Sequence, residues 1–98
     1  IGSMGGFLGS SKYPGLSAYS ASKSALSNLS ECLAVEFPQF ISNSLCLGAV
    51  QTEMLNIAFP NYQAPIDAKT MGKFIADFYQ SAPQVMNGKV IPVNLSNP

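Results

Sequence analysis

The order of strand-like and helical patterns along the chain constrains its fold more than any other feature of the sequence. Residues 1–6 read as the end of a strand entering a loop, and β-rich runs recur at 41–47 and 89–93. Helical patterns separate these runs, at 17–37, 52–59 and 71–78. Strands that alternate with helices favour a parallel sheet with right-handed crossovers. The sequence therefore predicts an α/β fold built on a parallel sheet.

The two longer helical patterns each have a start signal and an apolar stripe. Ser17 can cap the first of them, and Pro38 ends it. Its apolar positions recur three and four residues apart, which predicts a face buried in the core. These positions are Leu26, Leu29, Leu33 and Phe37. Asp67 offers a cap for the last helix. The predicted core stripe of that helix is Met71, Phe74, Ile75 and Phe78.

Composition excludes several classes of function. Five lysines balance five acidic residues, so nothing indicates binding to nucleic acid or to an acidic membrane surface. No apolar run approaches the roughly 18 residues that a membrane span needs. The absence of histidine removes Ser-His-Asp triads and most zinc sites, and no metal is expected. Cys32 and Cys46 are isolated, which predicts buried free thiols in a cytoplasmic protein.

The low charge content also suggests that other surfaces cover parts of the chain. Charged residues make up 10% of the sequence, against about 25% in ordinary soluble domains. The sequence begins at Ile1 rather than at a methionine. We therefore expect that residues 1–98 are one part of a longer domain, covered by the rest of it or by an oligomer partner.

Tyr19 and Lys23 carry the main chemical signal of the sequence. They are four residues apart in a helical pattern, so their side chains share one face of the helix. A neighbouring cation stabilises a phenolate relative to a phenol. Such a tyrosine can exchange a proton with an alcohol or carbonyl oxygen, which is acid–base chemistry that needs no histidine.

Two further segments are expected beside this pair. Ser3 follows the first strand, and residues 48–52 follow the second. Ligands of parallel α/β sheets bind beyond the carboxyl ends of the strands. A hydroxyl, a phenol–ammonium pair and a glycine turn with exposed backbone groups would therefore line one crevice.

With these residues in place, the chain resembles the short-chain dehydrogenase/reductase family. The resemblance lies in four segments that follow the family's order: IGSMGG at 1–6, PGLSAYSASKSAL at 14–26, NSLCLGAVQTEM at 43–54 and NGKVIPV at 87–93. It implies the C-terminal portion of a doubly wound parallel-sheet, Rossmann-type NAD(P)-binding domain over residues 1–98. The dinucleotide-binding N-terminal half would precede Ile1.

The resemblance also implies roles for individual residues. Tyr19 would be the general acid/base, Lys23 would assist it and bind the nicotinamide ribose, and Ser3 would orient the substrate oxygen. The Val50 backbone and Thr52 would hold the nicotinamide carboxamide. Gly48 would permit close approach of the cofactor. Ser3 could instead satisfy a backbone group at the strand end, and Thr52 could cap the next helix.

The chain departs from the family pattern in three places. Gly2 stands where the family usually has a serine, and Leu47 where it has a proline. The assignment of Ser3 also requires a three-residue insertion before Tyr19. Apolar residues after the second strand suggest either a lid over the substrate or ordinary packing, and both remain open. They are Met54, Leu55, Ile57, Ala58 and Phe59.

The implied activity is hydride transfer between NAD or NADP and a small carbonyl or alcohol substrate. The full-length protein would be a homodimer or homotetramer in which the long helix contacts its counterpart, and the 98 residues alone would be inactive. Two alternatives remain open. One is an epimerase or dehydratase that uses the same Tyr-x-x-x-Lys pair, and the other is an inactive fragment or oligomerisation module.

Overall fold

The centre of the fold is β2, Ser44–Leu47, the middle strand of a three-stranded parallel sheet. In this computed structural model, which describes residues 1–97, β2 pairs on one side with β1 (Gly2–Ser3) and on the other with β3 (Val90–Val93). Cys46 lies opposite Gly2 in one ladder and opposite Pro92 in the other. The predicted parallel α/β arrangement is confirmed.

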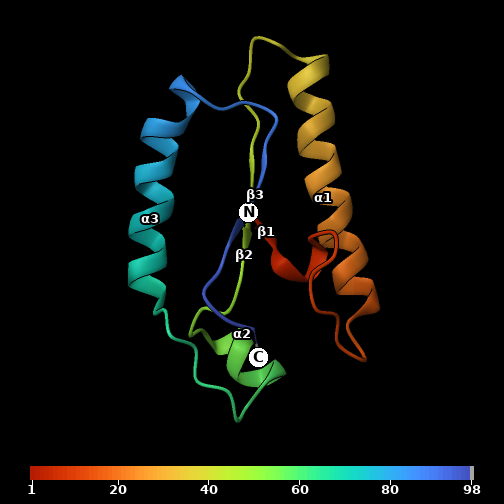
Figure 1. The fold of residues 1–98 in the computed structure, drawn as a ribbon, viewed down its shortest axis with the longest axis vertical. Coiled ribbons are helices and arrows are strands. Elements are labelled where there is room, and N and C mark those ends of the chain that lie inside the picture. Colours follow the sequence, from red (N-terminus) through yellow and green to blue (C-terminus); the bar gives the residue numbers. More distant parts are fainter. Residues whose placement is uncertain (98) are drawn as a thin grey trace.

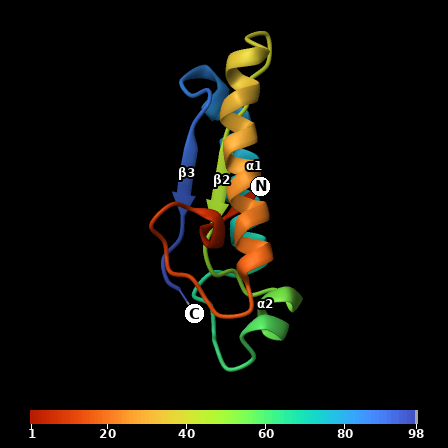
Figure 2. The same ribbon diagram turned by 90° about the vertical axis from the view of Figure 1, so that its right-hand side faces the viewer.

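Two long helices cover opposite faces of this sheet (Figures 1 and 2). They are α1, Ser17–Glu36, and α3, Ala68–Ser81. The shorter elements are the 3₁₀ turns η1 (Met4–Gly6) and η2 (Ala82–Gln84) and the helix α2 (Glu53–Ala58). α2 lies near the carboxyl end of β2 (Figure 1). None of the helices within residues 1–97 is long and apolar enough to cross a lipid bilayer.

Serines form the face of α1 that packs on the sheet. Ser27 and Ser30 are its buried residues. The hydroxyl oxygen of Ser27 lies 3.2 Å from that of Ser44 in β2, and the hydroxyl oxygen of Ser30 lies 2.9 Å from that of Ser42. Small side chains bring the helix close to the sheet, and these hydrogen bonds satisfy their buried hydroxyls.

The predicted core stripe of α1 is therefore wrong. Its four apolar side chains keep between 37% and 53% of their surface exposed. They are Leu26, Leu29, Leu33 and Phe37. Leu26 and Leu33 are four and three residues from Ser30 and so share its side of the helix, where they line a hollow beside Ile1 and Ser44 and stay more than one-third exposed. In α3 the predicted stripe is buried only in part, because Met71 is 5% exposed while Phe74 is 42% exposed.

Three smaller predictions also need correction. Cys46 is fully buried, but Cys32 is exposed; both thiols are free. Ser17 is the first residue of α1 and not its cap, and Leu16 at the cap position makes no side-chain cap bond. The strand expected at 41–47 begins at Ser44, because the Asn43 side chain bonds to the backbone of residues 86 and 89 instead.

Asp67 caps α3 as predicted. One of its carboxylate oxygens accepts a hydrogen bond of 2.7 Å from the backbone N–H of Thr70. This bond, together with one from the Thr70 side chain, holds the pKa of Asp67 below its ordinary value. A carboxylate that is stabilised in the folded state contributes stability above its unfolded pKa of about 3.9, and the contribution is lost as the pH falls through the lower folded pKa.

We expect Asp67→Ala to lower the urea midpoint of unfolding of the protein at neutral pH, because the backbone N–H of Thr70 at the start of α3 loses its capping acceptor. Asp67→Asn keeps an acceptor and should lose less. The difference between wild type and Asp67→Asn should shrink as the pH is lowered through the folded pKa of Asp67. Equal urea midpoints for all three proteins at neutral pH would show that the cap contributes nothing.

Candidate active site

A pocket of about 440 Å³ lies at the carboxyl ends of β1 and β2. Its size falls within the range of roughly 300–1,000 Å³ that is typical of small-molecule sites. The pocket brings together all six positions that the sequence predicts. They are Ser3, Tyr19, Lys23, Gly48, Val50 and Thr52. Apolar side chains make up much of the remaining wall, among them Leu16, Leu47, Met54, Leu55 and Phe59.

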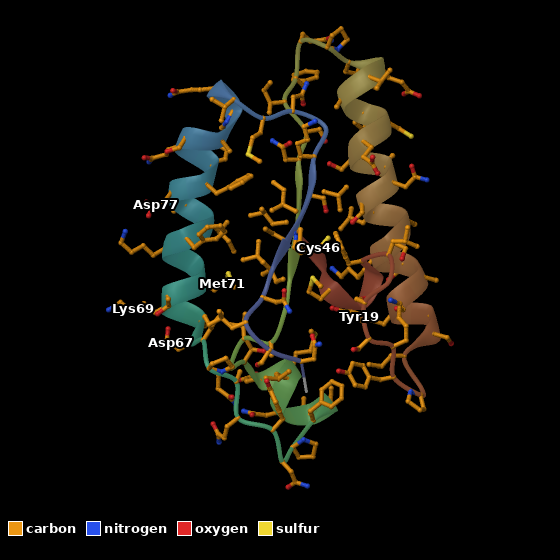
Figure 3. The ribbon with its side chains drawn as sticks, viewed as in Figure 1. Tyr19, Cys46, Asp67, Lys69, Met71 and Asp77 are labelled. Atoms are coloured by element: carbon orange, nitrogen blue, oxygen red, sulfur yellow. The ribbon has the colours of Figure 1, made fainter. Side chains whose placement is uncertain are left out.

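Tyr19 and Lys23 occupy successive turns near the start of α1, and both are half-buried. Figure 3 shows Tyr19 on the side of α1 that faces the sheet. The Lys23 Nζ atom lies 5.9 Å from the centre of the Tyr19 ring, a cation–π distance, and donates to the carbonyl of Ile1 at 3.5 Å. The ammonium thus lies between the phenol ring and the start of β1.

Gly6 sets how closely η1 approaches this turn of α1. A Cβ atom on Gly6 would lie 2.5 Å from the backbone carbon of Lys23 and 2.5 Å from the nitrogen of Ser24. The Ser24 hydroxyl donates to the Gly6 carbonyl at 2.7 Å, and the Ser20 hydroxyl donates to the Gly5 carbonyl. Sequence reasoning assigned Gly6 no role. Its place in a glycine pair, three residues after the end of β1, was the available signal for close backbone packing.

Ser3 ends β1 and caps η1. Its hydroxyl oxygen accepts a hydrogen bond of 3.0 Å from the backbone N–H of Gly5. The structural role that the sequence left open is therefore present. A hydroxyl has one donor and two acceptor positions, so this bond leaves the O–H able to donate to a ligand in the pocket.

The segment after β2 is held by its own backbone. Gly48 donates to the Val93 carbonyl at 2.8 Å, and a Cβ atom there would lie 2.1 Å from Cβ of Asn94. Glycine is thus required at this position by Asn94 itself. Thr52 caps α2, as the sequence allowed, by accepting a hydrogen bond of 3.2 Å from Leu55 N–H.

Gln51 is a structural residue of the site that sequence reasoning missed. Its backbone N–H donates to the Ile66 carbonyl at 2.8 Å, and its side-chain oxygen accepts from Ala64 N–H at 2.8 Å. These bonds close residues 52–66 into a loop that begins and ends at one place. These bonds join residues more than ten positions apart, so no local sequence pattern predicts them.

α2 forms one wall of the pocket. None of its residues is buried, and Leu55 is half-buried. The apolar residues that line the pocket here are Met54, Leu55, Ala58 and the following Phe59. Ile57 does not contribute, because it is 83% exposed on the outer side. Phe59 meets the ring of Tyr13 edge to face, with 5.1 Å between ring centres.

Solved structures of dehydrogenases share this fold. A 4-hydroxyisoleucine dehydrogenase complexed with NADH has a TM-score of 0.75 and 21% identity, over 96% of this chain and 43% of its own. Acetoin dehydrogenase from Enterobacter cloacae has a TM-score of 0.71 and 27% identity, over 96% and 40%. A small-chain dehydrogenase in complex with NADPH has a TM-score of 0.59 and 19% identity, over 95% and 46%.

The chain thus spans less than half the length of these proteins. No functionally curated protein matches the sequence. Residues 1–63 match the family model described as short chain dehydrogenase. The matched residues contain β1, the Tyr19–Lys23 pair, β2, the segment 48–52 and α2, and so every residue that the sequence predicted for the pocket. The chain belongs to the short chain dehydrogenase family.

Proposed function

We propose that residues 1–98 are the C-terminal, proton-transferring portion of a Rossmann-type NAD(P)-dependent oxidoreductase domain. The substrate would be a small alcohol or carbonyl compound. The observation that carries the proposal is the meeting of Ser3, Tyr19 and Lys23 at one pocket beyond the carboxyl ends of parallel strands. Family membership and the likeness to dehydrogenases solved with NADH and NADPH support it.

The chain's own residues would handle the substrate oxygen and its proton. A bound nicotinamide would accept hydride from the alcohol carbon, or return it to a carbonyl carbon. During oxidation, Tyr19 as phenolate takes the hydroxyl proton while Ser3 donates a hydrogen bond to the same oxygen. During reduction, Tyr19 gives that proton back. The Lys23 ammonium lies 5.9 Å from the centre of the Tyr19 ring, and the donors that converge on the oxygen would stabilise the charge that develops there.

The donor set on the cofactor side fits a nicotinamide riboside. Lys23 supplies an ammonium for ribose hydroxyls, and Thr52 and the backbone around Val50 supply polar groups for a carboxamide. The early glycines Gly2, Gly5, Gly6 and Gly9 lack the G-x-G-x-x-G spacing that binds a pyrophosphate. We therefore assign the phosphates and the adenine to another part of the domain, outside this chain.

The leucine row of α1 supports an additional role as a contact between subunits. Its side chains are more than one-third exposed, which is uncommon for a row of leucines on one helix face. We propose that the full-length protein is a homodimer or homotetramer joined through α1. The free thiols of Cys32 and Cys46 are consistent with a cytoplasmic location.

The test uses the full-length protein with NAD or NADP and a panel of small secondary alcohols and ketones, followed by the absorbance of the reduced nicotinamide. In Lys23→Ala we expect kcat and cofactor affinity each to fall by about tenfold or more, because one ammonium serves both the phenolate and the ribose. Cofactor affinity is measured by calorimetry.

Lys73→Ala is the matched control, since Lys73 lies on α3 in an exposed ion pair with Asp77. It should behave as wild type in both measurements. Loss of kcat without loss of cofactor affinity in Lys23→Ala would contradict the double role. Absence of turnover by the wild type with every substrate and both cofactors would contradict the proposed function itself.

A further inference from the structure

Tyr13 and Phe59 form an aromatic pair that joins two walls of the pocket. Tyr13 belongs to the loop at 7–16 before α1, and Phe59 follows the last residue of α2. Their ring centres are 5.1 Å apart, with 70° between the ring planes, which is the preferred edge-to-face arrangement. Both half-buried side chains line the same pocket as Tyr19.

The loop that carries Tyr13 is held firmly by its own hydrogen bonds. The Lys12 ammonium donates to the carbonyls of Phe7 and Ser10, at 3.1 and 2.9 Å. The Ser10 hydroxyl lies 2.8 Å from the Phe7 carbonyl and also contacts the Met4 carbonyl. The Lys12 ammonium therefore binds carbonyls of its own loop. Tyr13 follows this bonded segment, its carbonyl accepts from Leu16 N–H at 3.3 Å, and its side chain lines the pocket.

The α2 wall is fastened differently. Gln51 ties the base of residues 52–66, and Thr52 caps the helix, but no residue of α2 is buried. Few buried contacts make a segment easy to displace. Further along, the Tyr62 hydroxyl contacts the Ser96 hydroxyl, which holds the rest of the 52–66 loop. The contact between Phe59 and Tyr13 is what joins the far end of α2 to the loop at 7–16.

We propose that the Tyr13–Phe59 pair determines substrate specificity by limiting the size of the substituent that the pocket accepts beside Tyr19. The inference rests on the proposed oxidoreductase function and names its substrate class. Met54, Leu55 and Phe59 make this side of the pocket apolar. The class is therefore small, neutral secondary alcohols and ketones with short aliphatic substituents.

The experiment measures kcat/KM for a series of unbranched secondary alcohols and their aryl-substituted counterparts, with the full-length protein. In Tyr13→Ala and in Phe59→Ala, the ratio of kcat/KM for bulky over small substrates should rise by about tenfold or more. The double variant should gain less than the product of the two, since both changes open the same contact. Tyr13→Phe keeps the ring and should keep the wild-type ratio.

Ile57→Ala is the matched control, because Ile57 lies on α2 but is exposed and does not line the pocket. Its size ratio should equal that of the wild type. Hydrogen exchange gives a readout that does not depend on turnover: amides of residues 53–59 should exchange faster in Tyr13→Ala than in Ile57→Ala.

Normal turnover with an unchanged size ratio in both alanine variants would overturn this inference and leave the proposed function intact. Unchanged exchange of residues 53–59 in Tyr13→Ala would also overturn it, because the two walls would then be independent. A wild-type protein that turns over no alcohol or ketone with either cofactor would refute the proposed function, and the size limit with it.

Discussion

Replacing Tyr19 with phenylalanine should lower kcat of the full-length protein by about 10²–10⁴-fold, the contribution typical of a positioned proton donor or acceptor. The change removes only the phenolic oxygen. The ring that contacts Lys23, with 5.9 Å between the ammonium and the ring centre, remains in place. Cofactor affinity should therefore stay within about twofold of the wild type.

Three measurements check this expectation together: steady-state kcat, single-turnover reduction of the nicotinamide, and cofactor affinity by calorimetry. Tyr79→Phe serves as the matched control, because Tyr79 is 80% exposed on α3 and does not line the pocket. It should retain the wild-type kcat. If Tyr19→Phe keeps full single-turnover activity, Tyr19 does not transfer the proton.

Gly6→Ala should damage both stability and activity. The added methyl group would lie 2.5 Å from backbone atoms of Lys23 and Ser24, and backbone cannot move aside as a flexible side chain can. The expected loss in the free energy of unfolding is about 1–3 kcal/mol, as for other overpacked sites. The strain falls on the turn of α1 that carries Lys23. A shift of the Lys23 side chain by about 1 Å should lower kcat by about 10²-fold.

Gly72→Ala is the matched control, and its expected effect on the free energy of unfolding has the opposite sign. Gly72 lies within α3, and a Cβ atom there would meet no atom within 4 Å. This substitution should raise the free energy of unfolding by about 0.5–1 kcal/mol and leave kcat unchanged. Urea unfolding and steady-state kinetics measure both quantities. Wild-type stability and kcat in Gly6→Ala would show that η1 and α1 are not in close contact.

Local patterns were sufficient to predict the order of the elements, the Asp67 cap, the possible Thr52 cap and the placement of the six site positions at one pocket. Each of these follows from spacing within a few residues or from the rule that ligands bind beyond the strand ends. The same rules failed for the buried face of α1. A row of leucines at helical spacing indicates a face that avoids water, but not which surface covers it.

The serine face of α1 shows why the sequence misled. Ser27 and Ser30 are buried because small side chains permit close approach to the sheet, and their hydroxyls find partners in Ser44 and Ser42. Those partners lie 12 and 17 residues away in the sequence. The ties of Gln51 and the contact between Tyr13 and Phe59 are likewise non-local. Such contacts emerge only once the chain is folded.

The two cysteines differ in exposure, so the reactivity of the Cys32 thiol can show whether α1 is covered by another surface. Cys46 is fully buried in the central strand, whereas Cys32 is exposed on α1, three residues after Leu29 of the leucine row. Residues three apart on a helix are neighbours. A thiol-reactive dye added to the native protein would therefore label Cys32 first. Its rate of attachment would report whether another surface covers the outer side of α1, without any engineered residue.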